Sequence, residues 1–150
     1  MSENKINKIF DDSIAVITDT KKISLEIKKA IDLITKCYKK GGKIVIFGNG
    51  GSAADAQHLA AELIGRFQLK RQSLPAIALT TDTSILTALG NDYSFDFVFA
   101  RQCEALVKKE DVVIAISTSG KSKNVLDGIV VSRKKGACII GLTGSKGLTM

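Results

Sequence analysis

Four short apolar runs, separated by helical patterns, constrain the fold of this chain more than any other feature. The runs are KIVIFG (43–48), AIAL (76–79), DVVIAIS (111–117) and ACIIGLTG (137–144). Near-continuous runs rich in Val and Ile are typical of parallel strands that are buried on both faces. Helical periodicity fills the segments between and beside them, at 52–67, 83–89, 95–108 and 123–135. The alternation predicts an α/β fold with a doubly wound parallel sheet and right-handed crossovers.

Two amphipathic helices are predicted before the first strand. Apolar residues recur at helical spacing from Lys5 to Thr18 and again from Ile23 to Tyr38, and the second pattern ends at Gly41-Gly42. We expect one domain, residues 1–150, with a helical N-terminal extension over about 1–41 and an α/β core over about 42–150. The apolar stripes of the two helices must be covered by the sheet or by a partner subunit.

The end of the chain leaves the predicted sheet unfinished. Met150 follows the run 137–144 after the short turn GSKGLTM, and no helical pattern remains to cover the last strand. A sheet of this kind is usually covered there by a further helix. We therefore expect the natural protein to continue beyond residue 150.

Composition and leading sequence indicate an ordinary globular protein. Hydrophobic residues make up 45% and charged residues 25% of the 150 residues, enough for a core without disulfides or metal. The segment MSENKINKIF has no apolar signal region, and no apolar run is long enough to cross a membrane, so we expect a cytoplasmic location. Cys37, Cys103 and Cys138 lie far apart in apolar contexts, which predicts buried free thiols.

The net charge of +7 does not indicate a nucleic-acid-binding protein. The lysines occur in pairs at predicted helix ends and turns, and the chain has 6 Phe, 2 Tyr and no Trp with which to stack bases. A solvated basic surface explains the charge, and it is compatible with attraction of small anionic ligands.

The segment Gly48-Asn49-Gly50-Gly51-Ser52 joins the first predicted strand to a helix. Its glycines allow positive φ and close approach of the backbone to a ligand, and the helix N-terminus offers free N–H groups. The segment nominally fits the dinucleotide fingerprint. That motif requires an acidic residue about 20 positions later, whereas Asp82 lies 34 residues after Gly48, so NAD binding is disfavoured.

The segment STSGKS, Ser117 to Ser122, follows the third predicted strand. Its four hydroxyl groups and Gly120 suit a phosphate, which side-chain and backbone donors could surround. A Walker A motif is excluded because the leading glycine is missing and its position falls inside the strand. A Ser-rich turn that caps the helix 123–135 remains an alternative on these residues alone.

Two further polar pairs are candidates for function. His58, the only histidine, and Glu62 lie four residues apart on one face of the predicted helix 52–67. They could be zinc ligands, with the carboxylate able to move protons, or an ordinary surface pair. Asn91 and Asp92, in GNDYSF, are predicted from the residues alone to form a simple turn.

Three segments are together more specific than any single loop. They are GNGGSAADAQHLAAELIGRF, LTALGNDYSFDFVFARQ and AISTSGKSKNV. In combination they closely resemble the phosphoheptose isomerase (sedoheptulose 7-phosphate isomerase) family of sugar-isomerase (SIS) domains, over nearly the whole chain. The resemblance implies a flavodoxin-like doubly wound sheet with two extra N-terminal helices. It also implies a homotetramer in which these helices pack between subunits and the active sites lie at subunit interfaces.

The resemblance also assigns roles to individual residues. Glu62 would be the catalytic carboxylate and a substrate contact, His58 and Glu62 would be zinc ligands, and Arg66 would lie near the site. The substrate-binding residues would be Asn49, Gly50, Gly51, Ser52, Asn91, Asp92, Ser117, Thr118, Ser119 and Ser122. The family's remaining zinc ligands, a Gln and a second His that acts as acid or base, match no residue of this chain, so we expect it to bind zinc weakly.

The implied reaction converts sedoheptulose 7-phosphate to D-glycero-D-manno-heptose 7-phosphate, at the start of heptose biosynthesis for glycoconjugates such as lipopolysaccharide. Glu62 could move the proton between C1 and C2, and zinc could polarise the neighbouring oxygens. An alternative is a non-catalytic SIS-domain protein that binds the DnaA replication initiator. Proteins of that group lack a carboxylate at the position of Glu62. A third possibility is the sugar-phosphate sensing domain of a transcription regulator, but these 150 residues contain no predicted DNA-binding domain.

Overall fold

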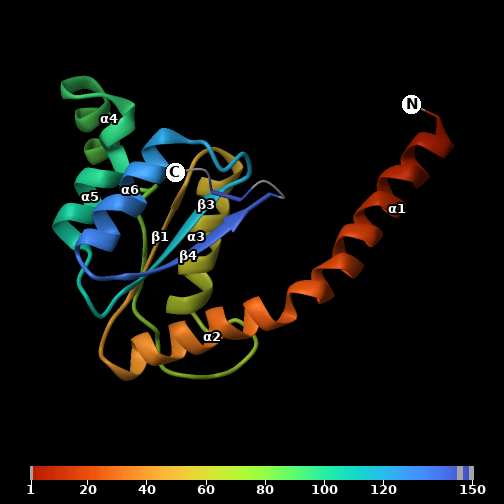
Figure 1. Ribbon diagram of the computed structural model, residues 1–150, viewed down its shortest axis with the longest axis horizontal. Helices are drawn as coiled ribbons and strands as arrows, with labels where there is room; N and C mark the ends of the chain where they lie inside the picture. The colour runs from red at the N-terminus through yellow and green to blue at the C-terminus, as the bar shows by residue number, and fades with distance from the viewer. Residues whose placement is uncertain (1, 145–146, 149–150) are drawn as a thin grey trace. The chain divides into compact units, whose positions relative to one another are not determined.

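The computed structural model describes residues 2–144, 147 and 148, and it contains one parallel sheet. The strands are β1 (Ile44–Gly48), β2 (Ala76–Ala78), β3 (Val112–Ser117) and β4 (Cys138–Thr143), in the order β2-β1-β3-β4 (Figure 1). All neighbouring pairs are parallel, and Ile46 lies beside Ala78 on one side and Ile114 on the other. The doubly wound α/β prediction is therefore confirmed, with each strand inside its predicted run.

Helices connect the strands and precede them. The helices are α1 (Glu3–Thr20), α2 (Ser24–Lys39), α3 (Gly51–Ile64), α4 (Thr83–Asp92), α5 (Val98–Leu106) and α6 (Lys123–Lys134). Two short 3₁₀ turns, Lys21–Ile23 and Phe95–Phe97, lie before α2 and α5. The turn predicted at Asn91 and Asp92 is wrong, because α4 continues to Asp92. Asp82 caps its start by accepting the Ile85 N–H at 2.9 Å, and Leu89 packs against the core.

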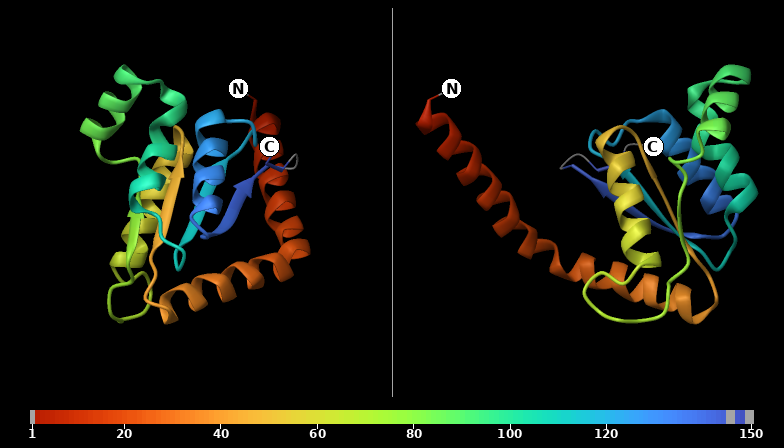
Figure 2. Two further views of the ribbon diagram at one scale, coloured as in Figure 1. Left: turned by 60° about the vertical axis from the view of Figure 1, so that its left-hand side comes forward. Right: turned by 180° about the vertical axis from the view of Figure 1, so that it is seen from behind.

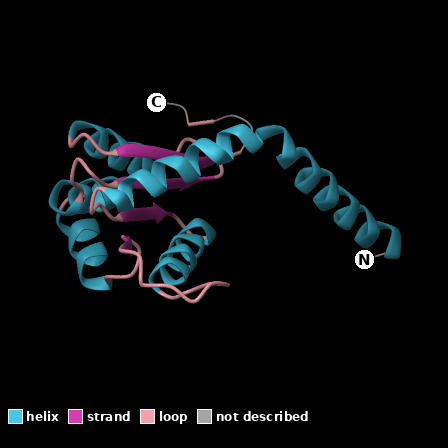
Figure 3. Ribbon diagram, turned by 90° about the horizontal axis from the view of Figure 1, so that it is seen from below, coloured by secondary structure: helices cyan, strands magenta, loops and turns pink. Residues whose placement is uncertain are grey.

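Helices cover both faces of the sheet (Figure 3). On one face, Ile44, Ile46 and Ile114 pack against Ala56 and Ala60 of α3 and against the end of α2 from Leu33 onward. On the other face, buried strand residues pack against α5 and α6. The strands contribute Val45, Phe47 and Val113, and the helices contribute Val98, Phe99, Val125 and Ile129. Crossovers that place helices on both faces bury the central strands completely, which explains their unbroken Val and Ile content.

The strand β4 lies at the edge of the sheet, and most of its side chains are exposed or half-buried. All three cysteines are free, and Cys37 and Cys103 are buried, but Cys138 on β4 is exposed. The prediction of three buried thiols is thus wrong for Cys138, because an edge strand has a neighbour on one side only. Burial raises the pKa of Cys103 to about 11 and also raises that of Cys37, which keeps both thiols protonated and unreactive.

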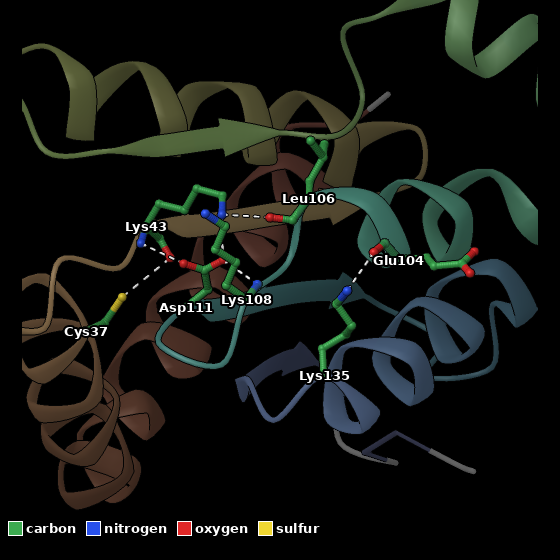
Figure 4. Close-up of polar contacts among 7 residues, drawn as sticks. All are labelled: Cys37, Lys43, Glu104, Leu106, Lys108, Asp111 and Lys135. Atoms are coloured by element: carbon green, nitrogen blue, oxygen red, sulfur yellow. Dashed lines mark hydrogen bonds and ion pairs between the residues drawn. The ribbon is translucent and has the colours of Figure 1, made fainter.

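An ion pair between the half-buried Lys43 and the buried Asp111 joins the amino ends of β1 and β3 (Figure 4). Lys43 Nζ donates to Asp111 Oδ2 at 2.6 Å and to the Leu106 carbonyl at 2.7 Å. The backbone N–H groups of Lys43 and Lys108 donate to the two oxygens of the same carboxylate. Burial would raise the pKa of Asp111, but the bonds from Lys43 and the backbone hold it below its usual value. This network lies at the opposite end of the strands from their carboxyl ends.

The chain divides into two compact units, residues 1–32 and 33–150. The first unit contains α1 and the beginning of α2, and every residue of α1 is exposed. Ile6, Ile9, Phe10, Ile14 and Ile17 nevertheless form an apolar stripe along α1. No helix within the described residues has the length and apolar character that a membrane span requires.

Candidate active site

The centre of the sheet contains the point at which its winding reverses. The chain passes from β1 to β2 on one side, and β3, the other neighbour of β1, is followed by β4 on the far side. In such sheets the loops after the two central strands separate and leave a crevice for ligands at their carboxyl ends. The segments after Gly48 and Ser117 are these two loops, and both contain predicted site residues.

The backbone of the first loop, which begins at Gly48, packs closely against β3. A Cβ atom on Gly48 would lie 2.7 Å from the Ile116 carbonyl oxygen and 2.7 Å from the Ser52 Cβ, so no larger residue fits. Gly50 has a φ of +57°, which favours glycine. The helix α3 then begins at Gly51 and the Ser52 side chain is buried. The N-terminus of α3, where N–H groups of the first turn donate to the Asn49 and Gly50 carbonyls, therefore lies at the carboxyl edge of the sheet, where the helix dipole would stabilise an anion.

The second loop is held by its own polar groups. Ser117 Oγ donates to Ser122 Oγ at 3.2 Å, and the Gly120 N–H donates to the Ser117 carbonyl at 3.1 Å. Thr118 and Ser119 are exposed, and Ser119 Oγ accepts the Lys121 N–H. Ser122 occupies the N-cap position of α6, but its side chain makes no cap hydrogen bond to the described helix. The hydroxyl group of Ser122 therefore does not cap α6, which was the alternative role for this serine.

A reciprocal pair of amide hydrogen bonds connects the two loop regions. Asn49 Nδ2 donates to Asn124 Oδ1 at 2.9 Å, and Asn124 Nδ2 donates to Asn49 Oδ1 at 3.0 Å. Asn124 lies in the first turn of α6 and is 4% exposed. No motif in the sequence points to a role for Asn124. The feature that could have revealed Asn124 is its position as a polar residue in the buried stripe of α6, beside Val125, Gly128 and Ile129.

The predicted His58–Glu62 pair lies on one face of α3. His58 Nε2 is 3.4 Å from Glu62 Oε1, and the two side chains are 75% and 38% exposed. Both line a cleft of about 530 Å³ together with Arg66 and several apolar residues, among them Leu59 and Phe67. The spacing prediction is correct, and the pair faces an open cleft that two cationic side chains, Arg66 and Arg71, also line.

The loop that carries Arg66 is attached to the end of α3 by Arg71, which the sequence reasoning did not single out. This loop runs from the end of α3 to the start of β2 (yellow-green in Figure 2). The Arg71 guanidinium donates to the carbonyls of Glu62, Leu63 and Gln72 at 2.9, 2.8 and 2.9 Å. Because the last carbonyls of a helix have no partner within it, Arg71 satisfies these acceptors and anchors the loop.

The donor set of His58 and Glu62 fits part of a zinc site. An imidazole nitrogen and a carboxylate oxygen are among the ligands that zinc takes, and here they lie close together on one helix face. Zinc takes four ligands, and the described residues contain no group of three or more His, Cys, Asp or Glu side chains suited to a metal. The pair could therefore supply two positions of such a site.

Asn91 and Asp92 lie in the last turn of α4. The Asn91 amide donates to the Asp92 carboxylate at 2.9 Å, and both residues are exposed. Figure 1 shows α4 at the far side of the sheet from β4. Their assignment as substrate contacts therefore rests on the family resemblance.

The helix α3 sets the distance between the loop at its amino end and the His58–Glu62 pair. His58 and Glu62 follow Ser52 by six and ten residues in the same helix. At 1.5 Å per residue these positions lie about 9 and 15 Å along the helix axis from Ser52. Helical side chains lean toward the N-terminus, which brings the carboxylate of Glu62 somewhat closer to the loops. A ligand that contacts both groups must therefore be an extended molecule.

Comparisons with known proteins show the family to which this chain is similar. The family model of the SIS domain matches residues 8–144. A phosphoheptose isomerase of Syntrophotalea carbinolica is 57% identical over 122 residues, which are 81% of this chain and 62% of that protein. A phosphoheptose isomerase of Campylobacter jejuni is 51% identical over 144 residues, which are 96% of this chain and 77% of that protein. The chain thus spans about three fifths to three quarters of the length of these relatives.

A solved structure has the same fold. The phosphoheptose isomerase of Neisseria gonorrhoeae superposes with a TM-score of 0.90 and 44% identity, covering 97% of this chain and 76% of that one. The SIS-domain match extends over nearly all of the sequence, and relatives above 50% identity share most of their own length with it. The chain therefore belongs to the phosphoheptose isomerase family of SIS-domain proteins.

Proposed function

We propose that this chain provides part of the active site of a ketose–aldose isomerase that converts sedoheptulose 7-phosphate to D-glycero-D-manno-heptose 7-phosphate. Membership of the phosphoheptose isomerase family supports this substrate. The observation that carries the proposal is the arrangement around α3. Two hydrogen-bonded strand-end loops meet at its amino end, and the same helix bears His58 and Glu62 further along.

The phosphate group binds at the second loop in this proposal. Thr118 and Ser119 expose their hydroxyl groups, and Ser117 and Ser122 lie beside them at the start of α6. A helix N-terminus adds free N–H groups that attract an anion. Asn49 to Ser52 approach from β1 and contact the sugar, and the net charge of +7 favours an anionic substrate. Asn91 and Asp92 are proposed as further substrate contacts.

The proton transfer is assigned to Glu62. Its carboxylate is partly exposed and faces the cleft that Arg66 also lines, so a sugar can reach it from solvent. Glu62 removes a proton from C1 of the ketose, which gives an enediolate with its charge on O2, and returns the proton to C2 while the O1 hydroxyl proton passes to O2, which leaves the aldose. The separation of Glu62 from the loops along α3 suits a sugar whose phosphate and reacting carbons are at opposite ends.

Zinc held by His58 and Glu62, with further ligands from outside the described residues, would polarise the substrate oxygens next to the reacting carbons. We also propose a homotetramer in the cytoplasm, with active sites at subunit interfaces. The exposed apolar stripe of α1 supports an assembly, because such a stripe needs a covering surface.

An isomerase assay on the full-length protein tests the proposal. Sedoheptulose 7-phosphate is supplied and formation of the heptose 7-phosphate is measured, with the zinc content determined on the same sample. Glu62→Gln keeps the size of the side chain but removes the base, so kcat should fall at least about 100-fold. Glu104→Gln, which changes an exposed carboxylate paired with Arg101 on α5, is the matched control and should keep wild-type activity.

Two results would contradict the assignment at different levels. Wild-type protein that forms no heptose 7-phosphate would refute the isomerase function and favour a binding role. Wild-type activity that survives in Glu62→Gln would leave the function in place but show that another group is the base.

A further inference from the structure

We infer that Asn124 is a positioning residue of the sugar-phosphate site, which orients the amide of Asn49 and holds the two strand-end loops together. The inference rests on the proposed function, since it concerns the same loops. The two asparagines are 75 residues apart in sequence, and each donates one hydrogen bond to the other. Asn124 is buried, whereas Asn49 is only half-buried and lies at the edge where a ligand would bind.

A third hydrogen bond fixes which way the amides point. The Val125 N–H, which can only donate, is 2.9 Å from Asn124 Oδ1. The oxygen of Asn124 must therefore face Val125, and its nitrogen must face the other way. Asn49 then has to direct its nitrogen toward Asn124 Oδ1 and its oxygen toward Asn124 Nδ2. The first turn of α6 thus determines the orientation of a side chain on the other loop.

This orientation matters for binding because it determines which hydrogen-bonding groups of the Asn49 amide remain available to a ligand. An amide has two N–H donors and two acceptor lone pairs, and Asn124 engages one of each. One donor and one lone pair remain on Asn49 for a sugar hydroxyl or phosphate oxygen. Without Asn124 the Asn49 amide could rotate, and the loop after β1 would lose its bond to α6. Substrate binding would weaken, while the proton transfer at Glu62 would be affected little.

The test measures KM and kcat for sedoheptulose 7-phosphate in the full-length protein. Asn124→Ala removes both hydrogen bonds to Asn49 and the one from the Val125 N–H, and we expect KM to rise about tenfold with kcat changed by less than about threefold. Ser132→Ala is the matched control, since Ser132 is buried in the same helix and donates one hydrogen bond, to Gly128. It should lower Tm somewhat and leave KM unchanged.

Two further variants separate positioning from a merely structural role. In Asn124→Asp the ionised carboxylate cannot donate to Asn49, but the protonated acid can, so its KM relative to wild type should fall toward unity as the pH is lowered. In a double variant, Asn49→Ala with Asn124→Ala, KM should rise no further than in the worse single variant, because the two residues act as one unit.

The outcomes distinguish this inference from the proposed function. Wild-type protein without isomerase activity would overturn both. An active wild type in which Asn124→Ala lowers Tm as Ser132→Ala does but keeps the wild-type KM would overturn the inference alone. So would additive effects of the Asn49 and Asn124 substitutions on KM.

Discussion

Gly48, the last residue of β1, is a position where a single methyl group should disturb the first loop of the site. Its added Cβ would meet the Ile116 carbonyl oxygen at 2.7 Å, and a backbone atom of a central strand cannot move away easily. We expect Gly48→Ala to lower the free energy of unfolding by about 2 kcal/mol, a typical value for overpacking. Urea unfolding followed by circular dichroism measures this.

Gly51 is the matched control for Gly48. A Cβ there meets no atom within 4 Å, and the residue lies in the first turn of α3. Gly51→Ala should therefore leave stability unchanged or raise it slightly, since alanine restricts the unfolded chain. Equal losses in the two variants would contradict the steric explanation.

Individual site residues differ in how far the sequence reveals them. The His58–Glu62 pair depends on helical spacing alone, so the pattern predicts it correctly. Asn124 and Arg71 owe their importance to partners that only the folded chain supplies, across 75 residues for Asn124 and through backbone carbonyls for Arg71. No periodicity marks such contacts.

At the scale of elements, β1 and β3 are joined at their amino ends by the Lys43–Asp111 pair, which gives stability a defined pH dependence. The pKa of Asp111 is lower in the folded state than in the unfolded chain. Its contribution is therefore complete above the unfolded value of about 3.9 and is lost as the pH falls below it. Asp111→Asn removes the charge at every pH, so we expect a loss of about 2 kcal/mol at pH 7.

Urea unfolding of wild type and Asp111→Asn at several pH values between 7 and 3 tests this dependence. The difference between the two proteins should shrink below about pH 4, because the wild-type carboxyl group then also becomes neutral. Glu110→Gln, at the exposed neighbouring position, controls for loss of one negative charge. A difference that stays constant with pH would show that the ionised carboxylate is not what stabilises the junction.

The strands were predictable at this scale because burial on both faces leaves a clear apolar run, as in Ile44 to Phe47. The ends of the helices were less predictable than the strands. The helical pattern continues past Ile64 to Phe67, but α3 ends at Ile64, where Arg71 binds the last carbonyls and the chain turns into a loop. Gly65 at the C-cap and the tertiary contacts of Arg71 together mark that boundary.

For the whole molecule, the sequence predicts two amphipathic helices that need a covering surface, and α1 does expose its apolar stripe. Within the SIS-domain family this stripe is the feature best explained by assembly, and the proposed tetramer would bury it between subunits. The stripe and the proposed active sites are then connected, because a site at a subunit interface needs the assembly to be complete. Loss of the stripe should therefore reduce both the assembly state and the activity.

Replacing three residues of the stripe tests the assembly. Ile9→Glu, Phe10→Glu and Ile14→Glu together place charges where α1 is apolar, and the full-length variant should sediment at a lower mass than the wild type, for which we propose a tetramer. Its core should still unfold cooperatively in urea, since these side chains are exposed in the chain itself. Lys8→Glu and Ala15→Glu together change the net charge by the same three units on the face of α1 opposite the stripe, and should leave the mass unchanged. A monomeric wild type, or a stripe variant with the wild-type mass, would contradict the tetramer and would require another surface to cover α1.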